Sequence, residues 1–486
     1  MKKIYALLLV VVMLATSILS TSCNLFTNSH LCDECGKCNH SDCTLDEHAT
    51  KCVCASIKSE LPVYGDIEGH EGFHLSVFAE PAQQTVEAYQ MLVDLGCNWV
   101  YIDPWNGTSL GSTGLVKALE VCEQVGLNAM IMTANGYNTN DNPHTFVSIF
   151  DTDVDYTQYP AFKGCYAYDE PNQHMLANYV VPDYERWEQS HYKDYLYMIN
   201  TCSSTGPNET IYDWVDFYWN TFLSKSDDNI LMFDKYGLYA RVGDKTVPYL
   251  REYFIQHLDA YSPIARDQGS YYISYIQTYA EKDGSAREMV SVNDARWQVA
   301  MNLAYGVDGL ACFTYLTMNQ FGNSMITPNN DPLPAYYYVQ EVFAELKEFE
   351  DVYFAFDWQG TITHLGPNRG AERGYGEQNE SHFTELRNSI TSHDRIDSIK
   401  TEYDLVVGTF KDDNGYDGFL ITSYTDPYYM KDNNIEIDFN NASRALVYLN
   451  GALITNDEAG TCYVLEDGVL KYDLEAGDYL FVVPVK

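Results

Sequence analysis

The sequence predicts an α/β protein with a closed barrel of eight parallel strands, followed by a small antiparallel all-β domain. From Gly72 onward, apolar runs of strand length alternate with amphipathic helical segments. This alternation is typical of a parallel sheet that helices cover on both faces. Eight such units occur in about 275 residues, the number that closes a (β/α)8 TIM barrel. After residue 400, short strands separated by Asp, Asn and Gly have no helices between them, which favours an antiparallel fold.

The barrel elements can be placed in order along the chain. The expected strands are Phe73–Phe78, Asn98–Ile102, Asn128–Met132, Phe162–Tyr168, Tyr195–Ile199, Asn229–Phe233, Tyr271–Ile276 and Gly309–Phe313. Helical periodicity is clear over Thr85–Leu92 and Asp294–Leu303, and a helix from about Pro334 to Phe349 closes the barrel. The unit after the third strand is the weakest, because residues 135–142 are nearly all loop formers.

The domain boundaries follow from shifts in composition. We expect the barrel over residues 70–350, an irregular Gly-rich and polar connection over 351–400, and a β-sandwich-like domain over 401–486. The expected strands of that domain are Asp404–Phe410, Gly418–Tyr424, Asn434–Phe439, Ser443–Leu449, Cys462–Glu466 and Tyr479–Val483.

Composition excludes some classes of function. The 486 residues include 69 acidic and 29 basic side chains, for a net charge of −40, which argues against a nucleic-acid partner. The chain is 46% hydrophobic and only 20% charged, so it can bury sizeable cores. It contains 41 Tyr residues. Tyr combines a flat apolar face with a hydroxyl, which suits a protein that binds carbohydrate.

The N-terminus predicts export. Lys2 and Lys3 precede an apolar run and small residues, so residues 1–22 are expected to be a signal peptide. The segment ending at Cys23 resembles a bacterial lipobox, which implies lipidation of Cys23 and a surface or membrane-anchored lipoprotein. The alternative is a plain secreted protein. Because no later stretch is long and apolar enough to span a membrane, the lipid is the only membrane contact expected.

Cysteines are concentrated in a segment over residues 23–60. Besides Cys23 it holds Cys32, Cys35, Cys38, Cys43, Cys52 and Cys54. Their spacing suits either three disulfides or a zinc site, and it does not choose between the two. The six later cysteines stand singly in apolar surroundings, where buried free thiols are expected: Cys97, Cys122, Cys165, Cys202, Cys312 and Cys462.

Candidate functional residues lie where the barrel strands end, because the chemistry of such barrels sits at their C-terminal face. Asp169 and Glu170 end the fourth strand and Asp234 ends the sixth. Carboxylates beside aromatic faces are what glycoside hydrolysis requires. The expected substrate-binding residues are Glu80, Asp103, Trp105, Asn135, Asn200, Tyr236, Gln277, Tyr279 and Tyr315. The barrel has no metal or phosphate motif, so no cofactor is expected.

Several segments resemble one family. The run Gly164–Pro171 looks like the strand-four DEP motif of glycoside hydrolase-like TIM barrels, and Trp297–Leu310 with Phe313–Tyr315 is similar to their last helix and strand. Leu231–Tyr236 resembles their strand-six turn, and Ile276-Gln277 their strand seven. The stretch from Leu405 to Tyr479 resembles the β-domain that follows such barrels.

The resemblance implies that Glu170 is the general acid/base. The family's strand-seven nucleophile is a Glu, whereas this chain has Gln277. Three substitutes are open: Asp169, acting with Glu170 as in substrate-assisted hexosaminidases; Asp234; or Glu281 from the following loop. The rival interpretation is a surface glycan-binding protein that kept the barrel and lost catalysis.

Overall fold

The computed structural model describes residues 60–65, 72–103, 111–135, 144–145, 149–150, 152–201, 210–241, 243, 246–368 and 381–486. The expected signal peptide and the Cys-rich segment with its seven cysteines therefore lie outside the described residues. Among the described residues, Phe73 is the first that is buried in a hydrophobic core, and it lies at the start of the barrel.

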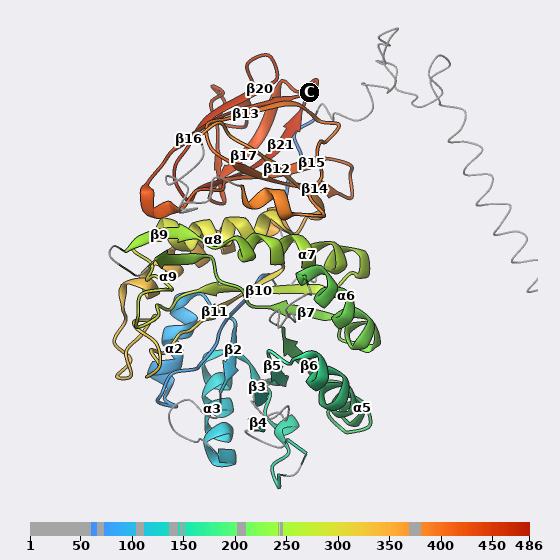
Figure 1. The fold of residues 1–486 in the computed structure, drawn as a ribbon, viewed down its shortest axis with the longest axis vertical. Coiled ribbons are helices and arrows are strands. Elements are labelled where there is room, and N and C mark those ends of the chain that lie inside the picture. The colour runs from blue at the N-terminus through green and yellow to red at the C-terminus, as the bar shows by residue number, and fades with distance from the viewer. Residues whose placement is uncertain are drawn as a thin grey trace, which may run out of the picture.

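Eight parallel strands form the barrel (Figure 1). They are β1 (His74–Val77), β2 (Trp99–Ile102), β3 (Asn128–Asn135), β5 (Phe162–Asp169), β6 (Leu196–Asn200), β7 (Ile230–Phe233), β10 (Tyr271–Gln277) and β11 (Gly309–Phe313). Ladders join β2-β3-β5-β6 and β1-β11-β10-β7. The parallel bridges Phe78–Tyr101 and Thr201–Phe233 connect these two groups at both edges, so the ring closes. The predicted fold class and the order of its strands are confirmed.

Helices pack around the strands. The longer ones are α2 (Val86–Leu95), α3 (Gly111–Val125), α5 (Val181–Glu188), α6 (Ile211–Thr221), α7 (Glu252–Gln268), α8 (Val292–Ala304) and α9 (Pro334–Tyr353). Local sequence sets their ends. The Thr85 hydroxyl accepts the Ala88 amide and begins α2, and Gly96, at φ 108°, ends it in a left-handed conformation that favours glycine.

Short elements occupy the connections between barrel strands. They are β4 (His144–Thr145), a 3-10 turn at Tyr156–Gln158, α4 (Gln173–Met175), a π-turn at Leu176–Val180, a 3-10 turn at Leu223–Lys225, and the hairpin strands β8 (Leu238–Arg241) and β9 (Val247–Leu250). The β8–β9 hairpin follows β7 and therefore lies at the C-terminal face of the barrel.

The C-terminal domain contains two antiparallel sheets. One contains β12 (Phe356–His364), β14 (Leu405–Asp412), β15 (Asp417–Ser423), β17 (Arg444–Leu449), β18 (Ala452–Ile454), β19 (Tyr463–Val464) and β21 (Tyr479–Val485). The other contains β13 (Ile396–Thr401), β16 (Asn433–Phe439) and β20 (Val469–Leu474). Both sheets contribute to one apolar core, with Val407 from β14 and Ile437 from β16 fully buried in it. The predicted sandwich-like domain is present.

This domain packs closely on the barrel. The other face of its larger sheet carries Phe410 and Phe481, which join the barrel core and contact the aromatic rings of α9. Figure 1 shows the red C-terminal domain seated on the yellow-green helices of the barrel. The larger sheet is therefore buried on both faces.

One predicted boundary differs from the structure. The expected irregular connection over 351–400 contains β12, whose ladder with β14 shifts register between Trp358 and Gly360. Gly360 replaces one of the apolar residues of this strand, and Gly inside a strand weakens the strand signal in sequence. Strands β13, β18 and β20 were not predicted either, since they are short or exposed along much of their length.

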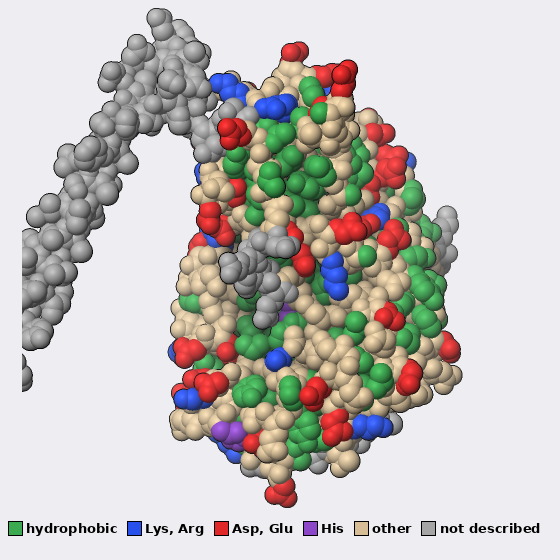
Figure 2. Space-filling view, turned by 180° about the vertical axis from the view of Figure 1, so that it is seen from behind, with side chains coloured by type: hydrophobic (Ala, Val, Ile, Leu, Met, Phe, Trp, Pro, Cys, Tyr) green, Lys and Arg blue, Asp and Glu red, His purple; other side chains and the backbone are tan. Residues whose placement is uncertain are grey.

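The surface agrees with the composition. Figure 2 shows acidic side chains scattered over the whole visible face rather than gathered in one place. In the described ranges, no helix is both long and apolar enough to cross a membrane. Cys97, Cys122, Cys165, Cys312 and Cys462 are buried free thiols, as expected, whereas Cys202 lies outside the described residues.

Candidate active site

Three carboxyl groups meet at the C-terminal face of the barrel. Asp169 is the last residue of β5, Glu170 follows it, and Asp234 follows β7. They line a cavity of about 530 Å³. Its lining residues are Phe78, Asp169, Glu170, Asn200, Asp234, Tyr236, Tyr275, Tyr279, Glu281, Phe313 and Phe321. The structure thus brings together the three predicted catalytic residues with Asn200, Tyr236 and Tyr279.

Asn200 connects two of these carboxyls. It ends β6, between β5 and β7, and its Nδ2 donates to Asp169 Oδ1 and to Asp234 Oδ1, each at 3.0 Å. The two oxygens therefore cannot lie further apart than twice that distance.

Glu170 is held in an unusual backbone conformation. Its φ is 48°, in the left-handed region that non-glycine residues seldom adopt, and its N–H donates to the Asn200 carbonyl at 2.9 Å. Strained residues of this kind cluster at functional sites. The Glu170 carboxyl lies beside that of Asp234, whose pKa burial raises and the contact with Glu170 partly restores.

Burial and mutual repulsion set the charge of the cluster. Burial, and then the nearby Asp234, raise the pKa of Asp169 to about 6, while hydrogen bonds from Asn200 and Tyr166 act in the opposite direction. Burial also raises the pKa of Asp234, opposed first by the charge of Lys235. Because like charges at this distance resist joint ionisation, the cluster retains a proton more readily than isolated carboxyls do.

Two tyrosines support Asp169 from below. The Tyr166 hydroxyl donates to Asp169 Oδ1 at 2.7 Å, and the Tyr275 hydroxyl donates to that of Tyr166 at 3.3 Å. Both side chains are buried inside the barrel. The pair leaves Asp169 little freedom to rotate, and it was not predicted from the sequence. Strand alternation offered a signal, since Tyr275 lies two residues before Gln277 and so shares its side of β10.

Aromatic rings form the walls of the cavity. Tyr236 and Phe313 stack with ring centroids 5.7 Å apart, and Tyr279 and Phe321 are 4.8 Å apart. Glu281 reaches the same cavity because its backbone bridges to that of Phe321. Burial, and then Asp283, raise its pKa. Phe313 and Phe321 were also missed, the latter because a loop residue carries no periodic signal.

Four predicted binding residues lie outside the lining: Gln277, Tyr315, Glu80 and Asp103. The Gln277 side-chain amide forms hydrogen bonds with backbone groups. Its Nε2 donates to the carbonyls of Leu238 at 2.9 Å and Arg287 at 3.1 Å, and its Oε1 accepts the Leu238 N–H at 3.1 Å. Tyr315 is fully buried, and Tyr336, Cys97 and Asp94 are among the groups around it. Glu80 is buried as well, and its carboxylate accepts the Asp103 amide at 2.8 Å.

The remaining predicted residues are only partly placed. Asp103 is buried and lies close enough to raise the pKa of Asp169, although it does not line the cavity. Trp105 lies outside the described residues, and of Asn135 only the backbone, at the end of β3, is described. Within the described ranges no group of three or more His, Cys, Asp or Glu is arranged to hold a metal ion.

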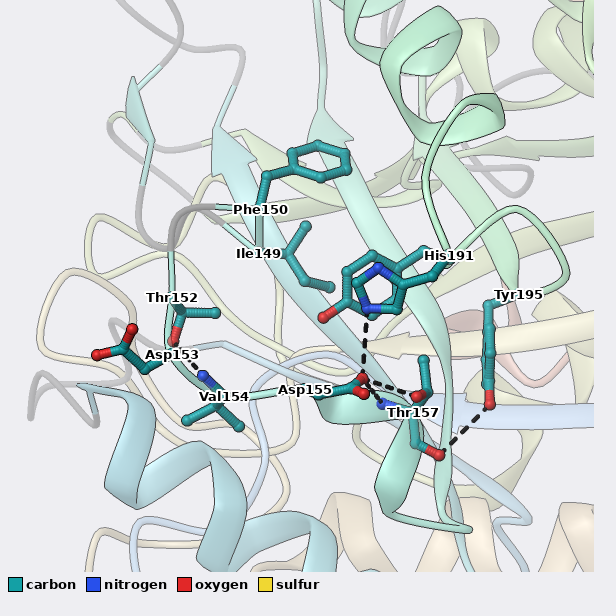
Figure 3. Close-up of a pocket in the computed structure, with 10 residues that line it drawn as sticks. Ile149, Phe150, Thr152, Asp153, Val154, Asp155, Thr157, His191 and Tyr195 are labelled. Atoms are coloured by element: carbon teal, nitrogen blue, oxygen red, sulfur yellow. Dashed lines mark hydrogen bonds and ion pairs between the residues drawn. The ribbon is translucent and has the colours of Figure 1, made fainter.

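A second cavity, of about 570 Å³, is formed by segments that precede β5 and β6, at the opposite end of the strands (Figure 3). His191 and Asp155 form an ion pair there at 3.3 Å, and the Thr157 hydroxyl donates to Asp155. None of the predicted catalytic residues lines it. The cavity at the C-terminal face is therefore the candidate active site.

No protein-family model and no curated sequence matches the chain. Among solved structures, it is similar to an endo-β-1,4-mannanase from Thermotoga petrophila, with 10% identity, a TM-score of 0.40, and coverage of 74% of this chain and 96% of that one.

Two further neighbours are an endo-α-mannosidase from Bacteroides thetaiotaomicron and a β-galactosidase from Marinomonas ef1. The first has 12% identity, a TM-score of 0.36, and coverage of 56% and 81% of the two chains. The second has 12% identity, a TM-score of 0.32, and coverage of 57% of this chain and 60% of that one, so this chain spans three fifths of its length. Catalytic residues and substrate have to be argued from this chain's own cavity.

Proposed function

We propose that this protein is a glycoside hydrolase that cleaves an oligo- or polysaccharide in the cavity at the C-terminal face of the barrel. One observation carries the proposal: Asn200 ties Asp169 to Asp234 by two hydrogen bonds, and Glu170 lines the same aromatic-walled cavity. Glycoside hydrolysis requires an acid that protonates the leaving oxygen and a second carboxylate that stabilises the oxocarbenium ion.

Glu170 is assigned the role of general acid/base. It directly follows β5, and its carboxyl lines the cavity beside Asp169 and Asp234, where it can reach the oxygen of a bound glycosidic bond. The leaving oxygen would take the Glu170 proton as the glycosidic bond breaks. After departure of the first product, the Glu170 carboxylate would accept a proton from the attacking water.

The second carboxylate is Asp234 or Asp169. Burial raises the pKa of Asp234, but Lys235, Asn200, Glu170 and Tyr236 oppose this rise, and these contacts favour Asp234 as the ionised partner. Asp169 is favoured in a substrate-assisted reaction, where it would orient a 2-acetamido group that attacks the anomeric carbon. Aryl glycosides with and without the 2-acetamido group separate the two routes. Only the route that uses Asp234 cleaves a substrate with a 2-hydroxyl group in its place.

Replacement of Glu170 tests the assignment. We expect Glu170→Gln to lower kcat on aryl glycosides with poor leaving groups, which need protonation to depart, by about 10²–10⁴-fold, the usual contribution of a positioned acid or base. Asp155→Asn, in the cavity at the opposite end of the strands, is the matched control and should retain full activity. Full activity in Glu170→Gln would remove Glu170 from the mechanism.

The rival function is glycan binding without hydrolysis, favoured by the absence of a strand-seven Glu at Gln277. It predicts retention of glycans by the parent protein and by Glu170→Gln, with no release of product by either.

We further propose that the protein is exported and anchored through a lipid on Cys23. Mass spectrometry of the N-terminal peptide tests this, and an unmodified Cys23 would favour the secreted form.

A further inference from the structure

The β8–β9 hairpin has two contrasting faces. Alternate residues of each strand point to opposite sides, and Leu238, Ala240, Pro248 and Leu250 are all buried. The other face carries two cross-strand pairs, Tyr239 with Tyr249 and Arg241 with Val247. These four residues, here called the hairpin strip, are partly or fully exposed. Solvent-facing positions of a short hairpin are usually polar. Two aromatic rings and a Val on this face therefore indicate a binding surface for a ligand.

The hairpin strip is continuous with the cavity. Tyr279 lines the cavity wall, and burial, then the nearby Tyr239, raise the pKa of Tyr279, so the two side chains are close neighbours. The backbone of the hairpin also joins the loop that carries Tyr279 and Glu281, since Ala240 N donates to Ser285 O at 2.8 Å and Tyr239 bridges to Ala286. A chain-like ligand leaving the cavity past Tyr279 therefore meets Tyr239 next.

The chemistry of the strip matches a sugar chain. The rings of Tyr239 and Tyr249 lie 6.2 Å apart, and both side chains offer apolar faces with hydroxyls at their edges. Arg251 donates to the Tyr239 hydroxyl at 2.8 Å and lies over its ring at 4.7 Å, which fixes that ring in place. A sugar ring offers the matching combination, an apolar C–H face with hydroxyl groups around its edge.

We propose that the hairpin strip binds the sugar units that extend beyond the cavity, so that the ligand is a polysaccharide chain rather than a mono- or disaccharide. The inference rests on the proposed function for the placement of one end of the chain at Glu170. The inference predicts that the affinity of the protein for a saccharide rises with the length of the saccharide. It also predicts that Tyr249 contributes to this rise.

The test uses binding in the Glu170→Gln background, so that no ligand is consumed. Affinity electrophoresis in gels containing mannan, xylan, laminarin, hydroxyethylcellulose or polygalacturonate identifies a polysaccharide that retards the protein. Calorimetric titration with its di- and hexasaccharides then gives the affinity ratio. We expect Tyr249→Ala to lower the hexasaccharide-to-disaccharide affinity ratio about tenfold, as the loss of one aromatic contact predicts.

Tyr337→Ala is the matched control, since Tyr337 is an exposed tyrosine on α9, outside the hairpin. It should leave the ratio unchanged, and melting temperatures should show that both variants are folded. An unchanged ratio in Tyr249→Ala, or no retardation in any gel, would overturn the inference. Tyr249-dependent retention without hydrolysis by the parent protein would support the strip and reject the proposed enzyme.

Discussion

The Asp169 carboxyl should give the site a distinct pH signature. An Asp in an unfolded chain has a pKa of about 3.9, whereas burial and Asp234 raise the pKa of Asp169 to about 6 in the folded protein. The folded state therefore binds this proton more tightly. Its contribution to stability is complete below about pH 4 and is lost as the pH rises through about 6.

We therefore expect Asp169→Asn, which keeps an acceptor for Tyr166 and Asn200, to raise the free energy of unfolding by about 1–2 kcal/mol at pH 7 and to change it little at pH 4. Urea unfolding at the two pH values measures this. Asp155→Asn is the control and should change the free energy of unfolding at pH 7 in the opposite direction, a decrease. The reason is that hydrogen bonds from Thr157 lower the pKa of Asp155. Equal effects of Asp169→Asn at both pH values would contradict the assignment.

At this scale the sequence could predict which side chains converge, but not where each one points. Asp169, Asn200 and Asp234 follow buried parallel strands, whose carboxyl ends meet at one face. Gln277 stands at an equivalent strand end, yet its amide binds the backbone of Leu238, at the start of β8, and of Arg287, in a loop. Loop positions of this kind depend on tertiary packing, which no local pattern records.

Among the elements, the loop from Tyr279 to Glu288 links the active site to the C-terminal domain. Arg287 is buried and donates to Asp294 at the start of α8 and to Asp426 of the C-terminal domain, each at 2.6 Å. Its carbonyl accepts the Gln277 amide. The position of Glu281 and Tyr279 in the cavity wall therefore depends on a contact made by another domain.

We expect Asp426→Ala to destabilise the protein by about 3 kcal/mol, because it leaves a buried guanidinium with one of its two partners. It should also lower kcat/KM by about tenfold through displacement of the cavity wall. Asp426→Asn keeps an acceptor and should lose less of both. Glu436→Ala, which breaks the exposed pair with Lys400, should leave melting temperature and activity unchanged. A stability loss without any change in kcat/KM would show that the loop holds its position unaided.

For the whole molecule, periodicity predicted both domains but not how closely they join. Each barrel strand is a short, mostly apolar and mostly buried run, which is a strong signal. The C-terminal sheet buries both faces, and nothing in its sequence says that one of them covers α8 and α9 of the barrel. The join is tight at Gly408 of β14, because a Cβ added there would collide with the carbonyl of Ala304 at the end of α8.

We therefore expect the barrel and the C-terminal domain to unfold in one cooperative transition, and a defect at their join to lower the melting temperature of the whole protein. Gly408→Ala should destabilise it by about 1–3 kcal/mol, the usual range for overpacking, while calorimetry still shows a single peak. Gly65→Ala adds the same methyl group where no atom lies within 4 Å, and should change nothing. Two separated peaks in Gly408→Ala, with the barrel melting at its original temperature, would mean that the barrel is stable without the C-terminal sheet.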